Sequence, residues 1–241
     1  MLFSRKKALR PLFKGFSDCH CHILPGVDDG FASEEKSMDI LRSYAELGVS
    51  AVWFTPHVME DVPNSTSFLK ERYDAFLLKA KAEIEGLPEI HLSSENMLDD
   101  LFEKRLADKD FLSYVDGHLL VETSYFNPPE NMATLLRGVK AKGYYPVLAH
   151  PERYLYMGKD EYHALLKGGI RFQLNIFSLC GLYGDTVRQK AEGLLKEGLY
   201  SFCGTDLHRR RTFEKYVDYK VDAKIYSLLD NLMHSVPCQK I

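Results

Sequence analysis

The chain has 241 residues, of which 45% are hydrophobic and 27% charged, and its formal net charge at pH 7 is −3. This length suits one large α/β domain, and the charge excludes a general attraction to nucleic acid or to an anionic membrane. No apolar run approaches the ~18 residues that cross a bilayer. The five cysteines, an odd number, argue against a secreted disulfide framework. We therefore expect a cytoplasmic globular protein with no nucleic-acid partner and no membrane insertion.

The first 14 residues are basic, with the sequence MLFSRKKALRPLFK. They contain neither the apolar stretch nor the small-residue cleavage site of a signal peptide, and we expect them to form a surface arm. No composition shift, low-complexity tract or long linker divides the rest of the chain. We therefore predict a single domain over residues 1–241.

Seven apolar or β-branched runs, each ending in a polar residue, predict buried strands at residues 15–22, 50–57, 89–95, 118–123, 145–150, 170–176 and 199–206. Helical patterns follow most of them, at residues 33–47, 67–85, 99–107, 129–142, 160–167, 182–197 and 212–234. Strands that alternate with helices indicate parallel pairing through right-handed crossovers. Seven such units in one chain favour a closed or nearly closed α/β barrel.

Two histidines, His20 and His22, alternate at the end of the first predicted strand, just before a Pro-Gly turn and two aspartates. Alternation places both imidazoles on the same face of a strand. Imidazoles beside a carboxylate are typical ligands of a divalent metal ion. Cys19 and Cys21 should face the other side, where small buried thiols are expected rather than metal ligands.

In a parallel α/β barrel, chemistry takes place at the carboxyl ends of the strands. The predicted strand ends of this chain carry nine candidate ligands, five of them histidines: His20, His22, Asp29, His57, Glu95, Glu122, His150, Asp206 and His208. The sixth strand offers only Asn175. The remaining four histidines fall at strand starts or on helices. This distribution predicts a metal centre at one end of the barrel.

Imidazole and carboxylate ligands without thiolate suit manganese, iron or zinc. Nine ligands exceed what one ion needs, so we expect two or three ions that share a bridging carboxylate. Neighbouring ions ~3.5–4 Å apart form a clamp for in-line displacement at phosphorus and lower the pKa of bound water.

Four segments resemble the PHP superfamily (polymerase and histidinol phosphatase): residues 20–30 (HCHILPGVDDG), 55–57 (TPH), 149–154 (AHPERY) and 205–208 (TDLH). Within it, the chain most resembles the CpsB/CapC-type bacterial tyrosine phosphatases of capsule and exopolysaccharide loci. The resemblance implies a distorted seven-stranded TIM-like (βα) barrel, the PHP fold, with a trinuclear, usually manganese-dependent centre. It also implies a phosphotyrosine protein as substrate, the tail of a membrane-associated bacterial tyrosine kinase that controls polysaccharide export.

The same resemblance implies a division of the ligands among three ions. The first ion would be held by His20, His22, Glu95 and Asp206, the second by Glu95, Glu122 and His150, and the third by Asp29, His57 and His208. Glu95 would bridge the first two ions. Asp28 is an alternative to Asp29, because spacing alone does not distinguish them.

Phosphomonoester hydrolysis also needs a group that stabilises charge on the phosphate oxygens. Arg153, three residues after His150, is the best candidate because a guanidinium is fork-shaped. Arg209, the first of three adjacent arginines, is a second candidate for substrate binding. A phenolate leaving group, with a pKa of ~10, has less need of a general acid than an alkoxide, although His57 or His208 could serve if metal does not fully occupy it.

Other functions also fit parts of the sequence. Cys203 and Arg209 have the Cys-x5-Arg spacing of a cysteine phosphatase, but Asp206 and His208, which the metal centre requires, lie between them. A small-molecule phosphomonoesterase such as histidinol phosphatase is the main alternative. A metal-dependent amidohydrolase would require a lysine or carbamate at a strand end, and no predicted strand ends in lysine. A non-catalytic binding module would not need nine ligands.

Overall fold

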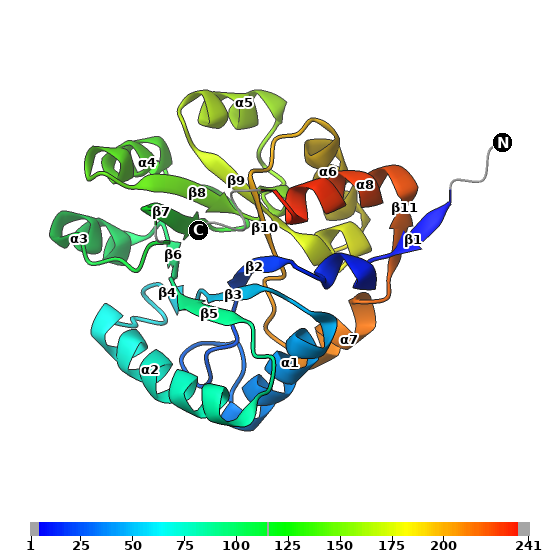
Figure 1. Ribbon diagram of the computed structural model, residues 1–241. Helices are drawn as coiled ribbons and strands as arrows, with labels where there is room; N and C mark the ends of the chain where they lie inside the picture. The colour runs from blue at the N-terminus through cyan, green and yellow to red at the C-terminus, as the bar shows by residue number, and fades with distance from the viewer. Residues whose placement is uncertain (1–4, 115, 236–241) are drawn as a thin grey trace.

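Short parallel strands form the centre of the protein, and helices surround them, as the computed structural model of residues 5–114 and 116–235 shows (Figure 1). One sheet has three strands in the order β2 (Ser17–Cys21), β3 (Ala51–Phe54) and β5 (Glu89–Leu92). The other has six, in the order β10 (Phe202–Gly204), β9 (Arg171–Asn175), β8 (Tyr145–Ala149), β7 (His118–Glu122), β6 (Glu95–Met97) and β4 (His57–Val58). All pairs in both sheets are parallel. The predicted distorted (βα) barrel is confirmed.

Two of the seven predicted strands are each divided between the sheets. The strand at residues 50–57 becomes β3 and β4, which Thr55 and Pro56 separate. Proline has no N–H to continue a ladder, and the Pro56 carbonyl instead accepts from the Glu95 amide at 3.1 Å. The strand at 89–95 divides into β5 and β6 at Ser93 and Ser94, whose hydroxyls both donate to the Leu112 carbonyl. These breaks distort the barrel, because β4 and β6 leave the three-stranded sheet and pair with each other beside β7.

The barrel closes where β2 meets the segment that follows β10. The Asp206 amide donates to the His20 carbonyl at 2.7 Å, and the His22 amide donates to the Leu207 carbonyl at 3.1 Å. Gly204 allows this approach, since a Cβ at that position would lie 2.5 Å from the His20 Cβ. The two histidines of β2 therefore lie directly beside Asp206.

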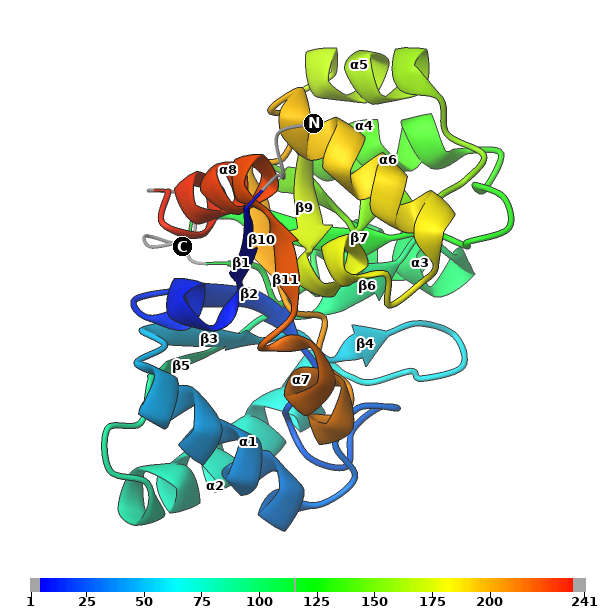
Figure 2. The same cartoon turned by 90° about the vertical axis from the view of Figure 1, so that its right-hand side faces the viewer.

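Helices α1 (Glu34–Leu47) and α2 (Thr66–Glu83) cover the three-stranded sheet, and α1 begins at its Ser33 cap and ends at Gly48, whose φ is 72° (Figure 2). The other crossover helices are α3 (Asp100–Asp108), α4 (Met132–Ala141), α5 (Lys159–Lys167) and α6 (Asp185–Lys196). Short 3-10 turns lie at η2 (Pro151–Arg153) and η3 (Ile176–Cys180). No helix among the described residues combines the length and apolarity that a bilayer crossing requires.

The single helix predicted for residues 212–234 is wrong. The chain forms α7 (Arg210–Tyr216), then the strand β11 (Lys220–Asp222), then α8 (Ala223–Met233). Val221 is buried, and the Asp222 side chain accepts from the Lys224 amide to cap α8. The helical pattern of apolar residues continues through Lys220–Asp222. The helix nevertheless ends before this segment, because β11 pairs with a distant strand.

That distant strand comes from the predicted surface arm. β1 (Lys6–Ala8) pairs antiparallel with β11, and the turn η1 (Arg10–Phe13) follows. Leu9, Leu12 and Phe13 are buried in the core. The prediction of a surface arm is therefore wrong for its described part, because the apolar residues between the basic ones pack against the barrel.

Candidate metal centre

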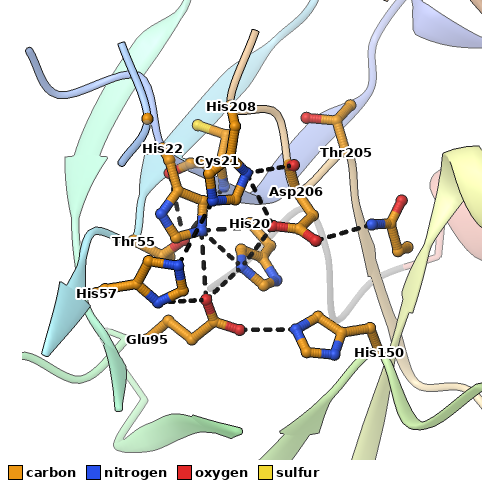
Figure 3. A network of polar contacts seen from close by, with 12 residues as sticks. His20, Cys21, His22, Thr55, His57, Glu95, His150, Thr205, Asp206 and His208 are labelled. Atoms are coloured by element: carbon orange, nitrogen blue, oxygen red, sulfur yellow. Dashed lines mark hydrogen bonds and ion pairs between the residues drawn. The ribbon is translucent and has the colours of Figure 1, made fainter. Parts of the chain in front are cut away.

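The structure brings all nine predicted ligands to one end of the barrel. His20 and His22 come from the end of β2, and Figure 3 shows them facing His57, Glu95, His150, Asp206 and His208. Glu122 ends β7, and Asp29 lies on the loop after β2. Parallel strands with a common polarity place all their carboxyl ends at the same edge. Three overlapping groups of donor atoms result, in each of which the atoms lie within 4.8 Å of one another.

The first group consists of His20, His22, Glu95 and Asp206, all four buried. The Nε2 atoms of the two histidines lie 3.2 Å apart. Glu95 Oε2 is 3.2 Å from the His20 Nε2 and 3.3 Å from the His22 Nε2, and Asp206 Oδ1 is 3.5 and 3.4 Å from the same atoms. This is the set that the resemblance implies for one ion.

The second group consists of His57, Glu95 and Glu122. His57 Nδ1 lies 3.2 Å from Glu95 Oε2 and 3.0 Å from Glu122 Oε1. All three of these atoms are buried, and among the described residues they have only these close ion-pair contacts and no hydrogen bond of regular geometry. Buried polar atoms without partners are costly, and a cation between them would satisfy all three. His150, which the resemblance assigns here, has its Nε2 2.9 Å from Glu95 Oε1 and 3.8 Å from Glu122 Oε2.

The third group joins His22, Asp29, His57 and His208. Asp29 Oδ1 lies 3.6 Å from His57 Nε2 and 3.3 Å from His208 Nε2. His57 therefore presents Nδ1 to the second group and Nε2 to the third. The resemblance implied a role for His57 in the third group alone, whereas its ring lies between two.

The two neighbouring aspartates have different roles. Asp28 Oδ2 lies 2.8 Å from His22 Nδ1 and accepts from the His57 amide, and its Oδ1 accepts from the Gly30 amide. Burial opposes ionisation of Asp28, but the charges of His22 and His57 and the hydrogen bonds with His22 and the Gly30 amide together lower the Asp28 pKa. A carboxylate on the far nitrogen of a ligand histidine orients that ring. The geometry therefore assigns orientation of His22 to Asp28 and leaves Asp29 as the candidate ligand.

Two amide side chains on β9 complete the surroundings of the first group. Gln173 Oε1 lies 2.8 Å from His20 Nδ1, and Asn175 Nδ2 donates to Asp206 Oδ2 at 2.9 Å. The sequence interpretation noted Asn175 but missed Gln173. Their alternation on one strand in the sequence FQLN was the available signal, since it places both amides on one face.

The electrostatics of the first group favour a cation. Burial alone would lower the pKa of His20, but the charges of Glu95 and Asp206 raise it to about 9. Burial alone would raise the pKa of Glu95, but His20 and His57 hold it well below its usual range. His20 likewise lowers the pKa of Asp206 against the effect of burial. These buried carboxylates remain ionised only with positive charge beside them, which protons on the histidines or metal ions can provide.

Arg153 lies at the edge of the centre between two aromatic rings. Its guanidinium carbon is 4.0 Å from the ring centroids of both Tyr125 and Tyr183, and its Nη1 donates to Asp206 Oδ2 at 3.1 Å. The Tyr183 hydroxyl donates to the same Asp206 oxygen, and the Tyr125 hydroxyl donates to Glu122 Oε2 at 3.4 Å. The sequence interpretation missed both tyrosines, which lie on loops and carry no motif.

Arg153 and its flanking tyrosines line a cavity of about 460 Å³ together with the outer ligands. The other lining residues are Asp29, His57, Met59, Glu95, Met97, Glu122, Leu182, Asp206, His208 and Thr212. The cavity therefore offers metal-binding groups, one guanidinium and an aromatic and apolar wall to the same ligand.

Arg209 is placed differently from the prediction. Its Nη1 donates to the backbone carbonyls of Asp29, Gly30 and His208. These contacts use one terminal nitrogen of the guanidinium and hold the loop that carries Asp29, and Arg209 is absent from the cavity lining. The substrate-binding role predicted for Arg209 therefore gains no support from the cavity lining and stays a prediction.

A cysteine nucleophile does not fit the site. Cys203 is completely buried on β10 and does not line the cavity. Asp206 and His208, which lie between Cys203 and Arg209, face the donor groups instead of forming a phosphate cradle. Cys19 and Cys21 are buried thiols, as predicted.

An α/β barrel whose strand ends combine three groups of imidazole and carboxylate donors defines a metal-dependent barrel enzyme. The family model for capsular polysaccharide synthesis, CpsB/CapC, matches residues 16–219. The chain belongs to the CpsB/CapC family.

Individual relatives agree with this assignment. The tyrosine-protein phosphatase YwqE of Bacillus subtilis is 29% identical over 205 residues, which cover 81% of this chain and 78% of YwqE. The tyrosine-protein phosphatase CpsB of Streptococcus pneumoniae is 27% identical over 225 residues, which cover 87% and 90% of the two chains. A solved chain from the crystal structures of YwqE and CpsB, described as unique metal-dependent tyrosine phosphatases, superposes with a TM-score of 0.76 and 25% identity. That superposition covers 93% of this chain and 95% of the solved one.

Proposed function

We propose that this protein is a metal-dependent protein-tyrosine phosphatase, a phosphoric monoester hydrolase that uses no cysteine nucleophile. The observation that carries the proposal is the single cavity shared by three metal-donor groups and the guanidinium of Arg153. Family membership and the described activity of YwqE and CpsB support it.

The donor set fits two or three divalent ions, and we propose manganese, with iron or zinc as alternatives, because the donors are imidazoles and carboxylates without thiolate. The proposed ligands are His20, His22, Asp29, His57, Glu95, Glu122, His150, Asp206 and His208. When bound, such ions polarise phosphate oxygens and lower the pKa of a coordinated water.

Arg153 is the proposed phosphate-binding residue. Its Nη1 is held by Asp206, and two rings cover its faces, so its remaining N–H groups are available only at its edge. Charge on the equatorial phosphate oxygens grows in the transition state, and a fixed planar fork stabilises it without reorganisation. Burial opposes the charge of Arg153, but contacts with Tyr183 and Asp206 raise its pKa and keep it cationic.

His57 and His208 are the proposed candidates for donating a proton to the leaving phenolate, and either can do so only from a ring nitrogen that metal does not occupy. Both line the cavity and remain partly exposed, whereas His20 and His22 are completely buried. The His208 Nδ1 lies 2.9 Å from the Asp206 carbonyl, which fixes the ring and leaves its Nε2 toward the cavity. A phenolate with a pKa of ~10 requires only partial protonation as it leaves.

The cavity wall favours an aromatic phosphoester over a small polar one. Tyr125, Tyr183, Leu182, Met59 and Met97 line it, and such side chains provide the apolar contact that a phenyl ring requires. A phosphotyrosine protein is therefore the proposed substrate, and the tail of a bacterial tyrosine kinase that controls polysaccharide synthesis is the proposed partner. Histidinol phosphate remains the second candidate substrate.

Metal depletion combined with a substrate panel tests this function. We expect chelation to abolish hydrolysis of a phosphotyrosine peptide and manganese to restore it. The phosphotyrosine peptide should be preferred to the matched phosphoserine peptide and to histidinol phosphate. Full activity after metal depletion, verified by elemental analysis, would contradict the metal-dependent mechanism. A clear preference for histidinol phosphate would instead support the second candidate.

A further inference from the structure

A second groove adjoins the metal-lined cavity. It has a volume of about 330 Å³ and shares the side chains of Met59 and Met97 with the cavity. Its other lining residues are Glu60, Asp61, Leu98, Asp99, Ser124, Asn127 and Pro129. Because the two spaces share a wall, a polypeptide with one residue in the cavity can place a neighbouring residue in this groove.

The groove is built by fixed backbone. Met59 and Val62 exchange two backbone hydrogen bonds of 3.2 and 3.0 Å, so Glu60 and Asp61 form the tip of a two-residue turn. The Glu60 amide donates to Asp99 Oδ2 at 2.8 Å, which ties this turn to the start of α3. Figure 2 shows the loop after β4 projecting beyond the strands.

A second contact fixes the base of the same loop. Asn64 Nδ2 donates to the carbonyls of Val27 at 2.9 Å and His57 at 3.0 Å. The turn that carries Glu60 and Asp61 is therefore held at Glu60 and just beyond the turn at Asn64, and the second contact links the loop to the backbone of His57, which lines the cavity.

The charge of the groove indicates which kind of side chain it binds. Glu60 and Asp61 are exposed, and no ion pair joins either of them to a lysine, arginine or histidine of the described chain. The floor between them and the cavity is apolar and includes Met59, Met97 and Leu98. A side chain with an apolar stem and a cationic head matches both parts, because the stem covers the floor while the head stays near the carboxylates and water. An acidic side chain would be repelled.

We infer that this groove receives a lysine or arginine of the substrate polypeptide that lies close in sequence to the phosphotyrosine. The inference rests on the proposed phosphotyrosine phosphatase activity and specifies the substrate for that site. Because the two spaces adjoin and an extended chain advances about 3.3 Å per residue, we expect the basic residue only a few positions from the phosphotyrosine. Opposite ends of the site then bind opposite charges, with Arg153 on the phosphate side.

Matched phosphotyrosine peptides test this specificity. One series carries a single lysine at each of three positions on either side of the phosphotyrosine in an otherwise uncharged sequence. A second series carries glutamate at the same positions. We expect kcat/KM at one position to be about two- to tenfold higher for lysine than for glutamate, because a weak attraction between exposed charges is replaced by a repulsion of similar size. The preference should shrink as salt concentration rises.

Substitutions in the turn test whether the groove causes the preference for lysine. The double substitution Glu60→Gln/Asp61→Asn should abolish the preference for lysine, and Glu60→Lys/Asp61→Lys should reverse it. Hydrolysis of p-nitrophenyl phosphate, which does not reach the groove, should stay unchanged in both and shows that the proteins are folded and metallated. Glu46→Lys is the matched control, because exposed Glu46 lies near the end of α1 at the opposite end of the barrel and should leave the preference intact.

Two results would overturn the inference, and they are distinguishable. Equal kcat/KM for all the peptides, or a lysine preference that survives both double substitutions, would refute the groove while leaving the phosphatase activity in place. Failure to hydrolyse any phosphotyrosine peptide, with histidinol phosphate hydrolysed in the same preparation, would refute the proposed function together with the groove.

Discussion

Arg153 illustrates how single residues of this site are positioned by their neighbours. Two tyrosine rings restrict the guanidinium to one plane, and Asp206 fixes one of its nitrogens. The hydroxyl groups of those tyrosines contact Glu122 and Asp206, which are candidate metal ligands. Phosphate binding by the arginine and metal binding by the carboxylates are therefore structurally linked.

Substitution of Arg153 should separate catalysis from stability. We expect Arg153→Ala to lower kcat/KM by about 30- to 1000-fold, or ~2–4 kcal/mol, because a charged contact that strengthens in the transition state is lost. Arg153→Lys should restore only part of the activity, since an ammonium lacks the planar fork. Kinetics, metal content and melting temperature measured on one preparation check this. Near-normal kcat/KM in fully metallated Arg153→Ala would remove Arg153 from the reaction.

Cys203 provides a test of the nucleophile. The Cys203→Ser protein should retain most of its activity, because this side chain is buried outside the cavity. The buried hydroxyl of the serine should lower the stability of the protein. Activity is therefore compared per folded, metallated molecule. Loss of turnover with metals still bound, together with a phosphocysteine detected by mass spectrometry, would support a cysteine mechanism.

At the scale of elements, the N-terminal segment belongs to the barrel domain. β1 adds a strand to β11, and the side chains of Leu9, Leu12 and Phe13 pack into the core. The Phe13 ring makes edge contacts with Phe16 at 5.8 Å and Phe213 at 5.5 Å between centroids. Phe213 lies on α7, shortly after the candidate ligand His208, so this packing supports the segment that carries two of the candidate ligands.

We expect Phe13→Ala to destabilise the protein by about 3–5 kcal/mol, the range for removal of a buried aromatic ring. Urea unfolding monitored by circular dichroism measures this change. Arg5→Ala, on an exposed residue of the same segment, is the control and should have little effect. Stability of Phe13→Ala equal to that of the control would show that the segment packs only loosely against the barrel.

At the scale of the whole molecule, the candidate metal centre joins the two sheets. His20 and His22 belong to the three-stranded sheet and its following loop, whereas Glu95 and Glu122 belong to the six-stranded sheet. Few backbone hydrogen bonds connect the sheets at β2 and β10. Ions held by ligands from both sheets would therefore act as cross-links.

Metal binding should consequently stabilise the entire fold. Saturation at 100 times the dissociation constant adds about 2.7 kcal/mol, which corresponds to a rise in melting temperature of roughly 5–10 °C for a protein of this size. Differential scanning calorimetry with manganese and with chelator measures the shift. Glu95→Gln should reduce the shift, because Glu95 belongs to two donor groups. An identical melting temperature with and without bound metal would contradict this cross-linking role.

The sequence by itself determined the barrel class and the set of residues that meet at its mouth. Strand polarity explains this success, because any polar residue at the carboxyl end of a parallel strand must lie at the same edge of the barrel. Residue type then restricted the chemistry, since five histidines and four carboxylates without a thiolate favour metal binding. Both inferences need only local patterns and one topological rule.

Only the tertiary structure decided what depends on contacts between distant segments. It showed that Asp28 orients His22 while Asp29 faces His208, that Arg209 binds backbone carbonyls, and that Tyr125 and Tyr183 enclose Arg153. Adjacent aspartates have the same local pattern, and a loop tyrosine has no periodicity that predicts its contact. The direction of such side chains is set by packing between elements far apart in the chain, and this information is absent from any local stretch of sequence.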